Sequence, residues 1–340
     1  MIFRSSLLCL LFAPFVLVAE VCYSFQTAIA LSPPSKTSNA QHLLFQSSSA
    51  LFYDDDDEGT VSSWTTSTGQ TITLIGTAHL SEKSNAQVER IISACQPNCV
   101  LVELDPTRLS RIGIESIGDI QNLQVVTSED ILLPNESQRP WYWLLLNGFA
   151  QVARKLLTGM YDEMSENMKN KEGGGGEFLV AIRAAESCEA CTKLILGDRD
   201  SVTTIQRAAQ LAMESGNPLR VLQKLSEANA QEMEQLEMRV RQDLGEDVDS
   251  ADFQVAMMER LKSDEELRNR LFSKLEQEVP EFTEAFLHER DFIMARAIAR
   301  EIESDFTLKQ VVAVVGLAHV PGIQAKLQEM LQQQQFAIQE

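Results

Sequence analysis

The chain has 340 residues, a hydrophobic fraction of 44% and a formal net charge of −20. This length is enough for one large domain or two ordinary ones, and the hydrophobic content is typical of a soluble globular protein. The acidic balance excludes general binding of nucleic acids, because such a surface repels phosphates and no basic cluster offsets it. A peptide or protein is the expected partner.

The first 60 residues are predicted to direct the protein to a compartment. Residues 1–24 carry Arg4 and then an apolar run over residues 7–19, which is typical of a signal peptide. The run is too short for a membrane span and contains Pro14, so we expect no transmembrane helix in the mature chain. Residues 25–60 form a Ser-rich leader without acidic residues up to Asp54. Together they resemble two-part plastid presequences; the alternative is secretion or an endomembrane lumen.

Four short apolar runs predict the buried strands of a mainly parallel sheet. Helical patterns follow most of these runs, so we expect an α/β fold in which helices flank a central, doubly wound sheet. We expect a single domain over residues 61–335, with a long helical insertion before the last strand at about residues 217–304. The four predicted strands are Thr71–Ile75, Cys99–Leu104, Lys193–Leu196 and Gln310–Val315.

Polar side chains follow each predicted strand, and parallel strands place them at one edge of the sheet. Two of the chain's four histidines, His79 and His319, occupy the same Gly-x-x-His setting after the first and last strands. Glu103 ends the second strand, and the third is followed by residues 198–200, Asp-Arg-Asp. Two imidazoles and a carboxylate suit zinc, manganese or iron. The alternative is that the histidines cap or pack, since spacing alone does not fix a metal.

A Glu-Arg-Asp triplet at residues 289–291 precedes the last strand and predicts partly buried charges. One interpretation is an ion-pair network between Arg290 and Asp198 or Asp200. The other is an arginine that clamps a substrate carboxylate or stabilises an oxyanion. His288 and His42 are not expected to belong to the site.

Four cysteines in the body of the chain leave two interpretations open. Cys188 and Cys191 have CxxC spacing, and with Cys95 and Cys99 they could form a four-thiolate zinc site. Because the second spacing is CxxxC and the local sequence looks helical, packing cysteines, with or without one oxidisable pair, are the simpler interpretation.

Taken together, five segments in order resemble the TraB family, which includes bacterial pheromone-shutdown proteins and the Tiki proteases. The resemblance covers roughly residues 71–132 and 177–325. The segments are residues 76–81 (GTAHLS), 102–105 (VELD) with Arg108, 197–200 (GDRD) with Thr204 and Arg207, 289–291 (ERD) and 316–323 (GLAHVPGI).

The resemblance to Tiki implies a metal-dependent peptidase, and the resemblance to the pheromone-shutdown proteins implies a role in limiting a signalling peptide. On this basis a divalent ion (zinc, manganese or cobalt) is expected on His79, His319 and Glu103. Glu103, Arg290 and Asp291 are the expected catalytic residues. The expected substrate-binding residues are Asp198, Arg199 and Asp200. The alternative is a non-catalytic regulatory module that binds a peptide or partner in the same pocket.

Overall fold

The structure is a computed structural model that describes residues 60–77, 82–133, 176–228, 230–245 and 264–339, with residues 253, 256, 257 and 260. The predicted signal peptide, nearly all of the leader and His79 lie outside these residues. The described chain forms two compact units. One holds the sheet, and the other is helical and includes residues 201–286.

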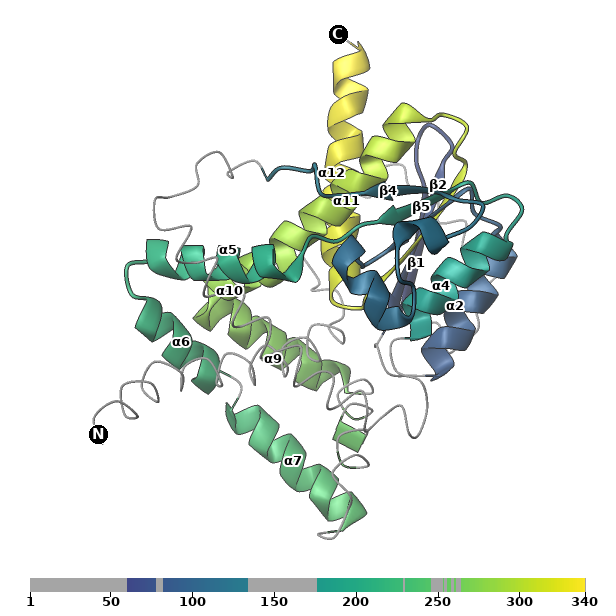
Figure 1. Ribbon diagram of the computed structural model, residues 1–340. Coiled ribbons are helices and arrows are strands. Elements are labelled where there is room, and N and C mark those ends of the chain that lie inside the picture. Colours follow the sequence, from purple (N-terminus) through teal and green to yellow (C-terminus); the bar gives the residue numbers. More distant parts are fainter. Residues whose placement is uncertain are drawn as a thin grey trace, which may run out of the picture. The chain divides into compact units, whose positions relative to one another are not determined.

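The sheet unit is built on six strands in the order β1-β2-β6-β3-β5-β4. All neighbouring pairs are parallel except β1 with β2. The α/β fold with a mainly parallel sheet is therefore confirmed (Figure 1). The strands are β1 (Val61–Thr65), β2 (Thr71–Thr77), β3 (Cys99–Val102), β4 (Gln124–Thr127), β5 (Lys193–Leu196) and β6 (Gln310–Gly316).

Helices cover both faces of this sheet, and side chains that alternate along each strand divide between the two faces. On β6, Val311, Ala313 and Val315 pack with α11 (Glu289–Ser304) and α12 (His319–Gln339). Val312 and Val314 pack on the other face with α2 (Glu82–Cys95) and α4 (Gly176–Ser187).

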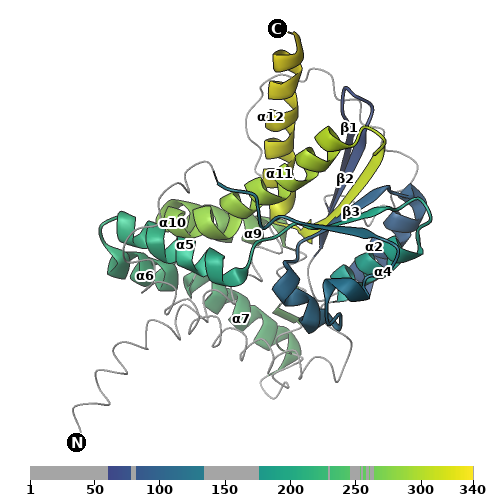
Figure 2. The ribbon, with the colours of Figure 1, turned by 45° about the horizontal axis from the view of Figure 1, so that its top comes forward.

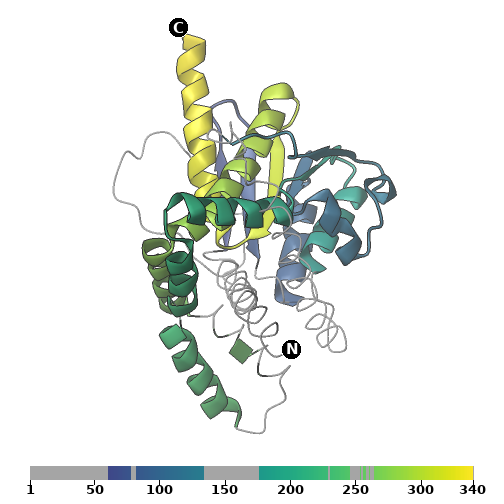
Figure 3. The ribbon, with the colours of Figure 1, turned by 60° about the vertical axis from the view of Figure 1, so that its left-hand side comes forward.

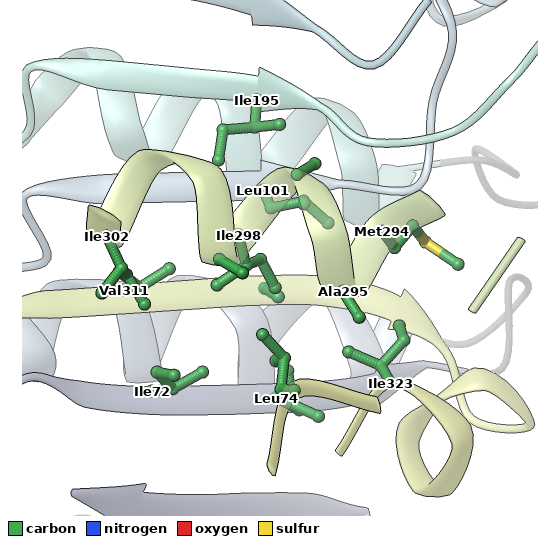
Figure 4. Packing of buried hydrophobic residues seen from close by; sticks show 14 of the residues in the cluster. Ile72, Leu74, Leu101, Ile195, Met294, Ala295, Ile298, Ile302, Val311 and Ile323 are labelled. Carbon is green, nitrogen blue, oxygen red and sulfur yellow. The ribbon is translucent and has the colours of Figure 1, made fainter. Parts of the chain in front are cut away.

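Figure 4 shows the first of these two cores, in which Ala295, Ile298 and Ile302 of α11 lie over strand residues such as Leu74 and Leu101. The last turns of α12 extend beyond the sheet in Figure 3. Short 3-10 helices η2 (Pro106–Ile112) and η3 (Ile117–Asp119) follow β3.

The helical unit contains α5 (Ser201–Glu214), α6 (Pro218–Glu227), α7 (Ala230–Leu244), α9 (Glu265–Glu278) and α10 (Pro280–Thr283) (Figure 2). The buried apolar side chains of these helices include Leu225, Leu236, Val240, Leu267, Leu271 and Leu275. A π-helix, η4 (Glu284–His288), leads into α11. None of the described helices is both long and apolar enough to cross a membrane.

Some local expectations need correction. Strands β1 and β4 were not expected: β1 is a polar edge strand, and β4 has only four residues, none of them fully buried. The last helix begins at His319, which places the imidazole in the first helical turn. The cysteines Cys95, Cys99, Cys188 and Cys191 are free thiols, three of them buried, so the packing interpretation fits them best.

A core substitution tests this architecture. Leu101→Ala should lower the free energy of unfolding by about 2–5 kcal/mol, because the fully buried side chain leaves a cavity between β3 and α11. Leu132→Ala is the matched control, since 75% of that side chain is exposed, and should change stability by less than about 0.5 kcal/mol. Urea unfolding followed by circular dichroism measures both; equal losses would contradict the assigned core.

Candidate functional site

The carboxyl ends of the parallel strands meet at one edge, as predicted, and carry a buried cluster of charges. The series Asp105, Arg108, Asp198, Arg290, Glu103, His319 and Asp291 alternates in sign from one contact to the next. We call these seven residues the edge cluster. They come from the ends of β3, β5 and β6 and from η2, α11 and α12.

Arg290 lies at the centre of the edge cluster. Its Nε donates to Asp198 Oδ1 over 2.9 Å, and its Nη2 donates to Asp198 Oδ2 over 2.8 Å. The same Nη2 also donates to Glu103 Oε1. The ion-pair interpretation of Arg290 with Asp198 is therefore observed. Burial of these charges is tolerated because each is paired and hydrogen-bonded.

Asp198 is held from three sides. Besides Arg290, Arg108 Nη1 donates to its Oδ2 over 2.8 Å, and the Ser128 hydroxyl donates to its main-chain oxygen over 2.7 Å. Burial acts to raise the pKa of Asp198, but the two guanidinium groups outweigh it and hold the pKa below its ordinary value. Asp198 is thus an ionised structural anchor at the end of β5.

Glu103 fastens the ends of two neighbouring strands. Its Oε2 accepts a hydrogen bond of 2.6 Å from the main-chain N–H of Gly316 at the end of β6. Its Oε1 contacts Arg290 and lies 3.4 Å from His319 Nε2. The carboxylate therefore faces the imidazole that the sequence pattern selected.

His319 is fully buried, with 0% exposure, and its two ring nitrogens differ. Nδ1 lies 2.6 Å from Asp291 Oδ1, whereas Nε2 has no hydrogen-bond partner among the described residues. Burial acts to lower the pKa of His319, but the negative charges of Glu103 and Asp291 raise it to about 9. Burial also raises the pKa of Asp291, against the opposing effect of His319.

The outer end of the edge cluster is formed by Asp105 and Arg108. Asp105 caps η2 by accepting from the Thr107 N–H over 2.8 Å, and burial raises the pKa of its carboxyl. Its Oδ2 has no hydrogen-bond partner among the described residues and lies 3.9 Å from Arg108 Nε. Arg108, 24% exposed, is the member of the cluster that reaches solvent.

The remaining predicted residues lie beside the cluster. Arg199 forms a buried ion pair of 2.7 Å with Glu289, at the first residue of α11. Burial lowers the pKa of Arg199, which Glu289 opposes. Asp200 is half-buried immediately before α5. The ion pair anchors the loop after β5, while the expected contacts of these residues with substrate stay a prediction.

Two features of the donor set fit a divalent ion at His319 and Glu103. With metal–ligand distances near 2.1 Å, two ligands of a tetrahedral ion lie about 3.4 Å apart, and His319 Nε2 and Glu103 Oε1 are separated by 3.4 Å. The cluster also has four carboxylates and two arginines, so a neutral His319 leaves two negative charges unbalanced. A dication would balance them.

The described residues supply only part of such a site. Among them, no three His, Cys, Asp or Glu side chains are grouped so as to hold a metal ion. The third predicted ligand, His79, follows β2 by two residues and lies outside the described part of the chain. Because β2 and β6 are parallel neighbours paired at Thr77 and Gly316, the sequence still places both Gly-x-x-His segments after adjacent strands.

The chain is similar in sequence to known proteins. The sequence profile described as the TraB/PrgY/gumN family matches residues 63–340. A TraB domain-containing protein of Homo sapiens is 26% identical over 268 residues, which are 75% of this chain and 62% of that protein. An uncharacterized protein of Methanocaldococcus jannaschii is 27% identical over 76% of this chain and 54% of its own length. The chain thus spans less than two thirds of these relatives.

Removing Arg290 should destabilise the sheet unit strongly. Arg290→Met leaves Asp198 and Glu103 buried without their shared cation, which should cost about 3–5 kcal/mol in the free energy of unfolding. Arg183→Met is the matched control, because that side chain is 55% exposed and its ion pair with Glu186 is a local contact within α4. Chemical denaturation of both variants measures the difference; a similar small loss in both would contradict the role of Arg290.

The stability of the metal-free protein should depend on pH through His319. Its folded pKa of about 9 lies above the ordinary value of 6.5, so its contribution is full below pH 6.5 and is lost as pH rises through about 9. The contribution should be on the order of 3 kcal/mol. Denaturation between pH 6 and pH 10 with a chelator should show this loss in the wild type and not in His319→Gln. His42→Gln should behave as the wild type, and superimposable curves for all three proteins would refute the assignment.

Proposed function

Because the chain belongs to the TraB/PrgY/gumN family, we propose that it is a metal-dependent hydrolase of peptides whose reaction centre is the edge cluster. The observation that carries the proposal is the setting of His319. Asp291 holds Nδ1, and Nε2 is left facing Glu103 at 3.4 Å without a hydrogen-bond partner. Histidines that bind a metal through one ring nitrogen commonly donate the N–H of the other nitrogen to a carboxylate, which fixes the orientation of the ring.

His319, Glu103 and His79 would hold the ion. A bound divalent ion lowers the pKa of a water ligand toward about 7 and polarises a carbonyl group. Asp291 would accept a hydrogen bond from Nδ1–H, which would leave the lone pair of the neutral ring on Nε2. The ion pair with Arg290 and the Gly316 N–H fix the Glu103 carboxylate, which would serve either as a ligand of the ion or as the general base that accepts a proton from water.

Arg290 would contribute charge rather than proton transfer. Its guanidinium is buried, and the carboxylates of Asp198 and Glu103 raise its pKa against the effect of burial, so it stays a cation. A fixed positive charge in a site of low dielectric stabilises negative charge that develops on a carbonyl oxygen. Asp198 and Arg108 hold this cation in place.

A peptide or protein is the proposed substrate. The proposed outcome of its cleavage is that a signalling peptide is limited.

The same geometry favours a second candidate function, a non-catalytic module that binds a peptide or partner. Both oxygens of Glu103 and both of Asp198 already have hydrogen-bond donors, from Arg290, Arg108 and the Gly316 N–H. With His319 protonated, its neighbours Glu103 and Asp291 each face a cation without a metal, as a structural network requires. Stoichiometric metal in the purified protein separates the two functions.

We propose in addition that the protein enters the secretory pathway and reaches a plastid, since residues 1–60 combine a signal-peptide pattern with an acid-poor leader. Secretion or residence in an endomembrane lumen is the alternative. An intact Met1 on the native protein, found by mass spectrometry, would contradict processing.

Metal content and cleavage test the proposed enzyme together. Untagged protein, dialysed and then loaded separately with Zn²⁺, Mn²⁺ or Co²⁺, should retain equimolar metal and cleave fluorescein-labelled casein. His319→Ala should abolish both. Glu103→Gln should lower the cleavage rate by about 100-fold to 10,000-fold, because a base near the reacting water is lost. Asp291→Asn should weaken metal binding by about 10-fold to 100-fold.

The controls carry matched changes away from the site. Glu266→Gln alters a side chain that is 90% exposed, and His42→Ala alters a histidine of the predicted leader. Both should retain metal and activity. Metal-free wild-type protein that gains no cleavage with any of the three ions would overturn the enzyme and leave the binding module.

A further inference from the structure

Gly322 lies one turn along α12 from His319, on the same side of the helix. The carboxylate of Asp291, from α11, occupies the space where a side chain at position 322 would begin. A Cβ placed on Gly322 would lie 1.9 Å from Asp291 Oδ2 and 2.6 Å from its Cγ. Even alanine is therefore incompatible with the observed position of this carboxylate.

Backbone conformation does not explain the glycine. Four described glycines (Gly69, Gly113, Gly216 and Gly245) have positive φ angles and so use the freedom of a residue without Cβ, but Gly322 is not among them. It lies within a regular helix, where glycine is the least favourable residue after proline. The remaining explanation for glycine at this position is steric, because the absence of a side chain leaves room for the Asp291 carboxylate.

The neighbour of Gly322 sets it apart from the other crowded glycines of the sheet unit, because that neighbour belongs to the edge cluster. A Cβ on Gly76 or Gly197 would approach mainly the apolar side chains of Leu317 or Leu101, and a Cβ on Gly176 would approach the side chain of Asn85. At Gly322 the three nearest atoms all belong to Asp291, the residue that holds His319 Nδ1 at 2.6 Å.

We propose that Gly322 is a positioning residue: it keeps open the space in which Asp291 holds His319 Nδ1, and thereby turns Nε2 toward Glu103. The catalytic use of this arrangement rests on the proposed function, but the positioning itself does not require a metal. Asp291 Oδ1 contacts the imidazole of His319, and Asp291 Oδ2 lies over Gly322. Any side chain at 322 must move the carboxylate and so break its bond to His319.

A double-mutant cycle tests the proposal in metal-free protein. Gly322→Ala should lower Tm by about 2–8 °C in the wild type, because the carboxylate is displaced. In an Asp291→Ala background the same change should leave Tm equal or higher, because the space is empty and alanine favours the helix. Gly118→Ala is the matched control, since its Cβ would meet only Ser116 Oγ at an ordinary 3.5 Å, and should be neutral in both backgrounds.

The NMR signal of the His319 ring proton on Nδ1 is a readout that general destabilisation of the protein would not change. In ¹⁵N-labelled protein at one fixed pH, the hydrogen-bonded Nδ1 proton should be present in the wild type and in Gly118→Ala and absent in Gly322→Ala. If Gly322→Ala alone does not fold, a folded Gly322→Ala/Asp291→Ala protein supports the proposal. An unfolded double variant, or a Gly322→Ala protein with unchanged Tm and an intact Nδ1 proton, overturns it.

The two proposals can fail separately. If Gly322→Ala loses the Nδ1 proton signal, the positioning role of Gly322 is supported. If the wild-type protein also binds no metal and cleaves no substrate, the proposed hydrolase is refuted while the positioning role stands. If the hydrolase holds, Gly322→Ala should weaken metal binding by the same factor as Asp291→Asn, of about 10-fold to 100-fold, while Gly118→Ala should not.

Discussion

The requirement that a buried charge be paired determines the structure of the sheet's carboxyl edge. Arg290 is enclosed by Asp198 and Glu103, which end two neighbouring strands and lie 92 and 187 residues away in sequence. A guanidinium buried without partners would be prohibitively costly, so the fold is stable only when α11 lies where both carboxylates reach it. Glu103 extends the same constraint to β6 through the Gly316 N–H.

Helix α11 links this ionic anchor to the imidazole. Arg290 and Asp291 are consecutive, so their side chains leave the helix about 100° apart. One contacts the strand ends, and the other contacts His319 at the start of α12. The orientation of the imidazole thus depends on the same helix that neutralises Asp198, and a rotation of α11 would disturb both. The π-helix Glu284–His288 directly before α11 is of a kind often found at functional sites.

The central strands and the edge they share follow from short-range signals in the sequence. Continuous apolar runs with polar residues at their ends were sufficient for β2, β3, β5 and β6, and hence for the convergence of Glu103, Asp198 and His319. The strands β1 and β4 carry no such signal, because a polar edge strand and a short strand without a buried residue resemble loops. The pairing of Arg199 with Glu289 and the role of Gly322 could not be predicted either, since both depend on which helix faces which strand end.

The charge of the edge cluster relates the two proposed functions to each other. A proton on His319 and a divalent ion at Nε2 exclude one another, since both use the same lone pair. The pKa of about 9 reflects the negative charge that surrounds the ring, and the same negative charge would attract a cation. The metal-free network and the proposed metal centre would therefore be two states of one set of residues. A cluster with one carboxylate fewer would bind its proton less tightly, but it would also lose negative charge that would attract a metal ion.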